Sequence, residues 1–181
     1  MISRLPWRWI GWGTVALLLL LPLVAMQFTD EVNWDAFDFV FMGALFGSVG
    51  LGLEFAFRKT GDTAYRGAVV VALAAAFFLT WINAAVGVIG DDDDPNIFYL
   101  GLVAVTLGAA IVGRFRPAAM ARAMIVAAFL QLLVPVIVWA VLPYMRTVVW
   151  SPEVPVLTAI FAGLWLFAAT LFRKVAQRGA L

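Results

Sequence analysis

Four consecutive aspartates, Asp91 to Asp94, separate two long apolar stretches in the segment VIGDDDDPNIF. Carboxylate oxygens are the ligands that Ca²⁺ prefers, so Asp91, Asp92 and Asp93 are weak candidates for a metal site. Calcium-binding loops, however, alternate their ligands with spacer residues and bend at a glycine, whereas adjacent side chains diverge. The favoured interpretation is a solvated acidic surface, followed by a docking surface for a basic periplasmic partner. Asp94 precedes Pro95, a pattern typical of a helix N-cap, which predicts that Asp94 starts a helix.

The residue types that most often carry catalysis are missing. The chain contains no histidine and no cysteine, and therefore lacks the usual ligands of haem, zinc and iron–sulfur clusters and the usual imidazole and thiol catalysts. Of its three serines, Ser3 and Ser151 lie near the predicted membrane faces, and Ser48 has no base nearby in sequence. We therefore predict no enzymatic activity, no catalytic residue and no cofactor. No basic tract with interleaved aromatic residues is present, so nucleic acid is not an expected partner.

Composition places these residues in a membrane protein. The chain is 65% hydrophobic and 13% charged, with a mean hydropathy of +1.01, which leaves too little polar surface for a water-soluble protein. About 20 apolar residues cross the hydrocarbon core of a bilayer. Six runs of this kind predict six transmembrane helices: Ile10 to Met26, Phe39 to Phe57, Gly67 to Gly90, Ile97 to Gly113, Ala123 to Leu142 and Val156 to Phe172. The expected fold class is an all-α polytopic helical bundle, with residues 1–181 forming a single transmembrane domain.

The basic residues predict the orientation, because Lys and Arg resist translocation across a membrane. In a six-helix arrangement eleven of the twelve Lys and Arg residues fall on one side, and only Arg146 falls on the other. The eleven are Arg4, Arg8, Arg58, Lys59, Arg66, Arg114, Arg116, Arg122, Arg173, Lys174 and Arg178. Both termini are therefore expected on the cytoplasmic side, with the acidic turn on the opposite side of the membrane.

Several polar residues fall within the predicted spans, where each needs a partner or water. Counted at about 1.5 Å per residue from the basic helix ends, Ser48, Thr106 and Gln131 all lie at about 12 to 15 Å. We predict that Gln131 bonds Thr106, Ser48 or a backbone carbonyl, because interhelical hydrogen bonds of this kind hold membrane helices together. Glu54 is the one acid within a predicted span, and its spacing from Arg58 predicts an i to i+4 ion pair.

A second group of polar residues leads toward the acidic turn. Thr80, Asn83, Gly87 and Asp91 recur at helical spacing, which would place them on one face of a helix. One interpretation is an outward-facing funnel for cations. The favoured alternative is close helix packing, with Asn83 bonding the backbone of a neighbouring helix.

The segments INAAVGVIGDDDDPN and GRFRPAAMARAM together resemble a family of small uncharacterised polytopic inner-membrane proteins of proteobacteria. The resemblance covers the middle of the chain and implies a bacterial inner membrane. Relatives are less uniformly acidic in the turn, which argues against a dedicated metal role. The family supplies no activity and no functional residues.

The functional prediction is an accessory or structural membrane subunit that acts through contacts with other membrane-protein subunits in the lipid bilayer. The alternative is a small transporter or channel that uses an acidic, cation-attracting periplasmic mouth.

Overall fold

The computed structural model describes residues 7–90 and 93–179, and in this part the chain is helical throughout apart from its turns. The long helices are α1 (Trp7–Ala25), α2 (Ala36–Lys59), α3 (Thr63–Ala85), α4 (Asp93–Val112), α5 (Pro117–Val141) and α6 (Glu153–Arg178). Two short 3-10 helices, η1 (Pro143–Met145) and η2 (Val148–Trp150), connect α5 to α6. All six long helices have the length and apolar composition needed to cross a membrane. The predicted helical membrane fold is therefore confirmed at this level.

Some helices extend beyond the predicted apolar runs, and one helix ends before the predicted end of its run. α5 begins at Pro117, six residues before the apolar run, and α6 continues to Arg178, beyond Phe172. Helical hydrogen bonds do not require lipid, so a helix continues into its polar flanks. α3 is shorter than predicted and ends at Ala85. The next residues form a turn in which Gly87 has a φ of +70°, a left-handed conformation that ends helices.

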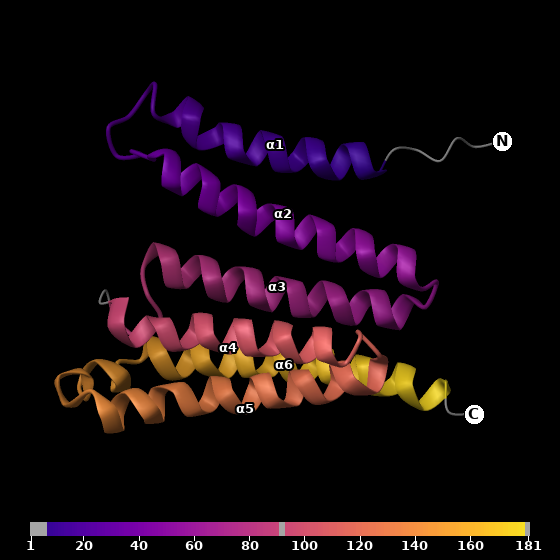
Figure 1. Ribbon diagram of the computed structural model, residues 1–181. Coiled ribbons are helices and arrows are strands. Elements are labelled where there is room, and N and C mark those ends of the chain that lie inside the picture. The colour runs from indigo at the N-terminus through magenta and orange to yellow at the C-terminus, as the bar shows by residue number, and fades with distance from the viewer. Residues whose placement is uncertain (1–6, 91–92, 180–181) are drawn as a thin grey trace. The chain divides into compact units, whose positions relative to one another are not determined.

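The first compact unit of the chain, Met1–Lys59, contains the hairpin of α1 and α2. The two helices run side by side in opposite directions (Figure 1). Trp12 of α1 covers Gly50 of α2 so closely that a Cβ atom at Gly50 would lie 3.3 Å from the indole ring. The missing side chain at Gly50 therefore allows the ring to rest against the helix backbone.

Two aspartates, Asp35 before α2 and Asp38 in its first turn, cap the start of α2. The Asp35 carboxylate accepts the backbone N–H of Asp38 at 3.0 Å, and the Asp38 carboxylate accepts the backbone N–H of Asp35 at 2.9 Å. This reciprocal pair is a capping box, which satisfies amides that have no acceptor within the helix. Asp35 and Asp38 thus have a structural role at the helix end.

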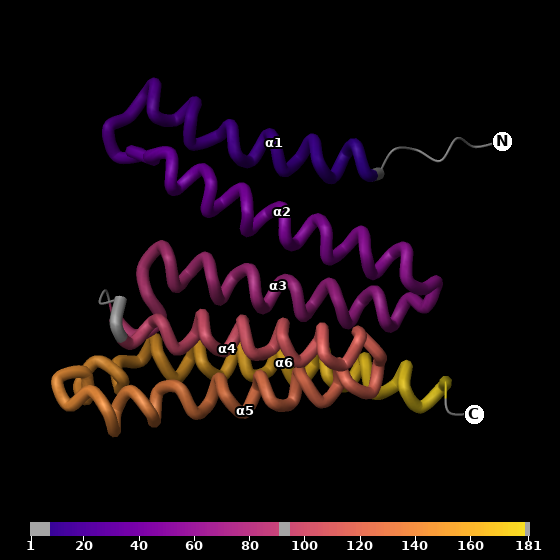
Figure 2. The backbone as a smooth tube through the Cα atoms, viewed as in Figure 1, coloured from indigo at the N-terminus to yellow at the C-terminus, as the bar shows by residue number. Residues whose placement is uncertain are grey.

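The second compact unit, Thr60–Leu181, contains α3 to α6. α6 packs against α3 and α5, and α4 packs against α5 and α3, which closes a ring of four helices (Figure 2). Small side chains on one face of α3, at Ala68, Ala72 and Ala75, are buried and permit close approach of the neighbouring helices. Trp165 and Phe172 of α6 are also fully buried and fill the interior.

Candidate functional site

Two of the polar residues predicted at mid-membrane depth bond within their own helices. The Ser48 hydroxyl donates to the carbonyl of Leu45, and the Thr106 hydroxyl donates to the carbonyl of Leu102, each at 2.8 Å. A carbonyl three or four residues earlier is always within reach of a helical hydroxyl, so this bond needs no neighbouring helix. Ser48 and Thr106 therefore each donate their hydrogen bond within their own helix. Thr80, the third predicted hydroxyl, is half-buried on α3.

Gln131 lies in the interior of the second unit. Its side chain is 0% exposed, and neither Oε1 nor Nε2 has a hydrogen-bond partner among the described residues. The prediction that Gln131 bonds Thr106, Ser48 or a backbone carbonyl is therefore wrong. Its burial on α5 excludes an orientation toward lipid, and a buried amide without a partner costs free energy unless water or a ligand satisfies it.

Three further polar groups of this bundle are also buried without a complete hydrogen bond among the described residues. Tyr99 of α4 is fully buried and its hydroxyl faces Thr158 of α6, yet neither hydroxyl completes a well-formed hydrogen bond among the described residues. The Trp165 indole N–H is likewise buried and unpartnered. Sequence reasoning missed all three, although Thr158 and Trp165 are seven residues apart and share a helix face. Together with Gln131 they make the interior of α4, α5 and α6 more polar than its apolar composition indicated.

The turn between α3 and α4 is held by Asn96, a residue that sequence reasoning also missed. The Asn96 Oδ1 accepts the backbone N–H groups of Val88 and Ile89 at 2.8 and 3.1 Å, and its Nδ2 donates to the carbonyl of Gly90 at 3.1 Å. Asn83 Nδ2 donates to the Asn96 backbone carbonyl at 2.8 Å. The interpretation of Asn83 as a residue that bonds the backbone of a neighbouring helix is confirmed.

The polar face predicted from Thr80 to Asp91 does not continue as a helix. α3 ends at Ala85, so Gly87 belongs to the turn, where its left-handed backbone and the Asn96 side chain redirect the chain. A Cβ atom at Gly87 would lie 1.9 Å from the Gly90 carbonyl oxygen, so the turn requires glycine at this position.

The acidic turn itself is only partly described. Asp91 and Asp92, two of the weak metal candidates, lie outside the described residues, and Asp93 is the first residue of α4. The prediction that Asp94 is the N-cap of this helix is wrong, because α4 begins one residue before it. Pro95 still lies in the first turn, where an N–H group has no acceptor within the helix and its loss costs no hydrogen bond.

Glu54 forms the predicted ion pair with Arg58 and a second one with Arg8 of α1. The Glu54 side chain is buried, and both arginines are exposed at their ends. A cavity of about 140 Å³ adjoins this ion pair and is otherwise lined mainly by apolar residues, among them Trp12 and Phe46. The Glu54–Arg8 pair joins α2 to α1, and both ion pairs compensate the charge of the acid within an apolar span.

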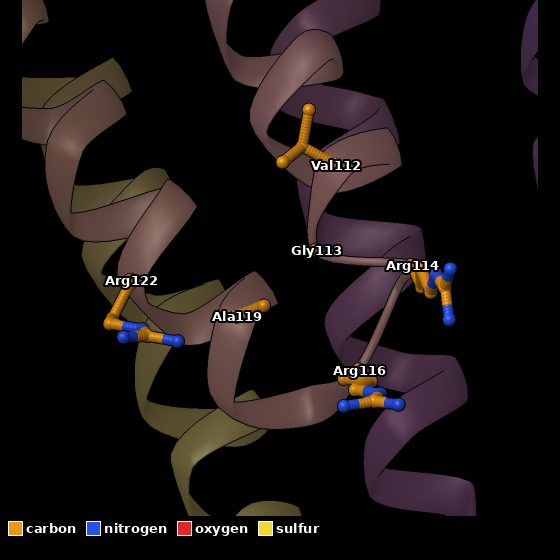
Figure 3. A pocket seen from close by; sticks show the side chains of 6 residues that line it. All are labelled: Val112, Gly113, Arg114, Arg116, Ala119 and Arg122. Carbon is orange, nitrogen blue, oxygen red and sulfur yellow. The ribbon is translucent and has the colours of Figure 1, made fainter.

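A pocket of about 270 Å³ lies at the turn between α4 and α5 (Figure 3). Its lining consists of Val112, Gly113, Arg114, Arg116, Ala119 and Arg122. Arg114 and Arg116 come from the turn, and Arg122 reaches the pocket from the second turn of α5 (Figure 3). All three arginines are exposed, and no lining residue is acidic.

The backbone of this turn is fixed by several hydrogen bonds. The N–H of Phe115 donates to the carbonyl of Ala110 and the N–H of Arg114 donates to the carbonyl of Ile111, which is a Schellman ending of α4. Arg114 and Phe115 have φ values of 50° and 54°, which are unusual for residues with side chains. The Tyr65 hydroxyl of α3 donates to the Phe115 carbonyl at 2.8 Å and holds this conformation from a third helix.

Comparison with protein-family models, with curated proteins and with solved structures found no match to this chain.

Proposed function

We propose that the protein is an accessory or structural subunit of the bacterial inner membrane that acts through helix contacts with partner subunits. Both termini face the cytoplasm in this proposal, and the chain belongs with small polytopic inner-membrane proteins of proteobacteria. The protein is not an enzyme and needs no cofactor for this role.

The observation that carries the proposal is how few residues the hairpin of α1 and α2 buries within itself. In the described part of this hairpin only Met42, Glu54 and Ala56 are buried, and all three belong to α2. By contrast, 39% of the apolar span of α6 is buried. An apolar hairpin that buries so little of itself is suited to contacts with lipid and with other transmembrane helices.

Photo-crosslinking in cells tests the proposal. A photoreactive residue replaces Leu51 on α2, which is 62% exposed, and separately Phe129 on α5, which is 63% exposed. We expect a discrete adduct with one membrane-protein partner from position 51 and lipid adducts from position 129. The same partner should co-purify with the full chain in mild detergent. Lipid or self adducts alone from both positions, together with a monodisperse homo-oligomer, would contradict the subunit role.

A specific observation favours a second candidate function, a small transporter or channel with an acidic, cation-attracting periplasmic mouth. Gln131, Tyr99, Thr158 and Trp165 place unpartnered polar atoms inside the second unit, and polar groups within membrane spans commonly mark ion or substrate paths. The test is uptake of Na⁺, K⁺ and Ca²⁺ by liposomes that contain the purified chain. We expect Gln131→Leu to reduce uptake and Thr170→Val, on the exposed face of α6, to leave it unchanged. Uptake no faster than in empty liposomes would exclude this function.

A further inference from the structure

We propose that the pocket at the turn between α4 and α5 binds the phosphate headgroup of an anionic phospholipid. We call it the arginine pocket and define it by Arg114, Arg116 and Arg122 around Gly113 and Ala119. This assignment is independent of any partner subunit.

Charge is the first argument for an anionic ligand. Arg114, Arg116 and Arg122 all line one pocket, and none of the described residues that line it carries a carboxylate. An anion in this pocket is attracted by all three positive charges. Guanidinium groups also match phosphate oxygens with two parallel N–H donors, which favours phosphate over a spherical anion.

The start of α5 adds a second source of positive potential. Arg116 is the N-cap of α5 and makes no side-chain capping bond, and Pro117 occupies the first helical position. The next amides, including that of pocket residue Ala119, belong to the first turn, in which N–H groups have no acceptor within the helix. The start of α5, where the positive end of the helix dipole lies, therefore supplies two of the residues that line the pocket, Arg116 and Ala119.

Position in the membrane favours a lipid as the source of the phosphate. The pocket lies where α4 ends and α5 begins, at the boundary of two predicted spans. Val112 lines the pocket and is 85% exposed, and the neighbouring Ile111 is 55% exposed. A headgroup phosphate at the arginines would thus place its acyl chains along an exposed apolar surface. Basic pockets between transmembrane helices bind anionic headgroups in this manner.

Close packing and hydrogen bonds fix the backbone of the turn that lines this pocket. A Cβ atom at Gly113 would lie 2.5 Å from the Ala119 Cβ, so glycine permits the close approach of the turn to α5. The left-handed residues Arg114 and Phe115 are held by the helix ending and by Tyr65. Pre-organisation of this kind reduces the entropy lost on binding.

The experiment titrates the full chain in a non-ionic detergent with phosphatidylglycerol, phosphatidylcholine or inorganic phosphate and follows the midpoint of thermal unfolding. A ligand that binds only the folded protein raises this midpoint. The pocket variant is Arg114→Gln, Arg116→Gln and Arg122→Gln. The control variant is Arg173→Gln, Lys174→Gln and Arg178→Gln, which removes the same charge from exposed positions of α6 outside the pocket.

We expect phosphatidylglycerol to stabilise the wild type and the control variant, and phosphatidylcholine to have little effect. The pocket variant should bind phosphatidylglycerol about 100-fold more weakly, the factor expected when three cations that attract anionic lipid are removed. If that variant does not fold, Arg122→Gln alone should weaken binding about fivefold relative to Arg173→Gln.

Three results would overturn the proposal. The wild type could show no response to phosphatidylglycerol, or the pocket and control variants could respond alike. In the third, inorganic phosphate alone would reproduce the full rise, which would make free phosphate the ligand and remove the lipid assignment.

Discussion

At the scale of single residues, Asn96 holds the turn between α3 and α4 by several hydrogen bonds. The Asn96 side chain accepts hydrogen bonds from two backbone N–H groups and donates to two backbone carbonyls. The Asn96 backbone carbonyl accepts a further hydrogen bond from the Asn83 side chain. The turn is buried at Val88 and Ile89, so water cannot simply replace a lost partner. The Asn96 side chain therefore supplies the hydrogen bonds that these backbone groups would have if the helix continued.

We expect Asn96→Ala to destabilise the protein by about 1 to 3 kcal/mol, because it leaves buried backbone N–H groups without an acceptor. The matched control is Asn33→Ala in the loop between α1 and α2, where the side chain is exposed and the change should be close to neutral. The measurement is unfolding of the purified chain in detergent, followed by circular dichroism. Equal stabilities of the two variants would show that the Asn96 hydrogen bonds contribute nothing.

The residue scale also shows what sequence could and could not predict about the candidate sites. The Glu54–Arg58 pair was predictable because both partners lie on one helix at fixed spacing. Gln131 and Thr106 lie at the same depth when residues are counted from the helix ends, but depth does not determine the direction in which a side chain points. Asn96 was missed because its partners become neighbours only after the chain leaves α3 at Ala85.

At the scale of elements, the hairpin of α1 and α2 depends on the contact between a large tryptophan ring and a glycine. Trp12 lies against Gly50, whereas a Cβ atom at Gly47 would have no neighbour within 4 Å. The two glycines are one turn apart on α2, so they compare the same substitution in two packing environments.

We expect Gly50→Val to destabilise the protein by about 1 to 3 kcal/mol, because the added methyl groups overlap the Trp12 ring and force the helices apart. Gly47→Val should change stability much less, since the two variants share the same loss or gain of helix propensity. Thermal unfolding of both variants in one detergent measures the difference. A smaller loss for Gly50→Val than for Gly47→Val would show that Trp12 does not hold the hairpin.

The number and type of helices were predictable from sequence because apolar run length is set by bilayer thickness. The helix ends were not, because they depend on local backbone chemistry. α3 stops where Gly87 turns left-handed, and α4 starts before the proline that was expected to mark its first position. Local backbone chemistry also decides the role of Asp35 and Asp38, which form a capping box at the start of α2.

At the scale of the whole molecule, the net charge of +1 conceals a strong separation of charge along the chain. Eleven of the twelve basic residues occupy the ends and turns predicted on one side, and the arginine pocket belongs to that set. If this side is cytoplasmic, the pocket faces the leaflet whose anionic lipids attract basic segments.

The charge separation predicts the topology of the chain. The chain has no cysteine, so a single cysteine can be introduced at Gly61, between α2 and α3, or at Asp92, which lies outside the described residues. Because Lys and Arg resist translocation, we expect a membrane-impermeant maleimide to label Asp92→Cys in cells whose outer membrane alone is permeabilised. Gly61→Cys should react only after the inner membrane is opened, and the cysteine-free parent controls for background. Labelling of Gly61→Cys but not of Asp92→Cys would reverse the orientation and place the arginine pocket on the periplasmic side.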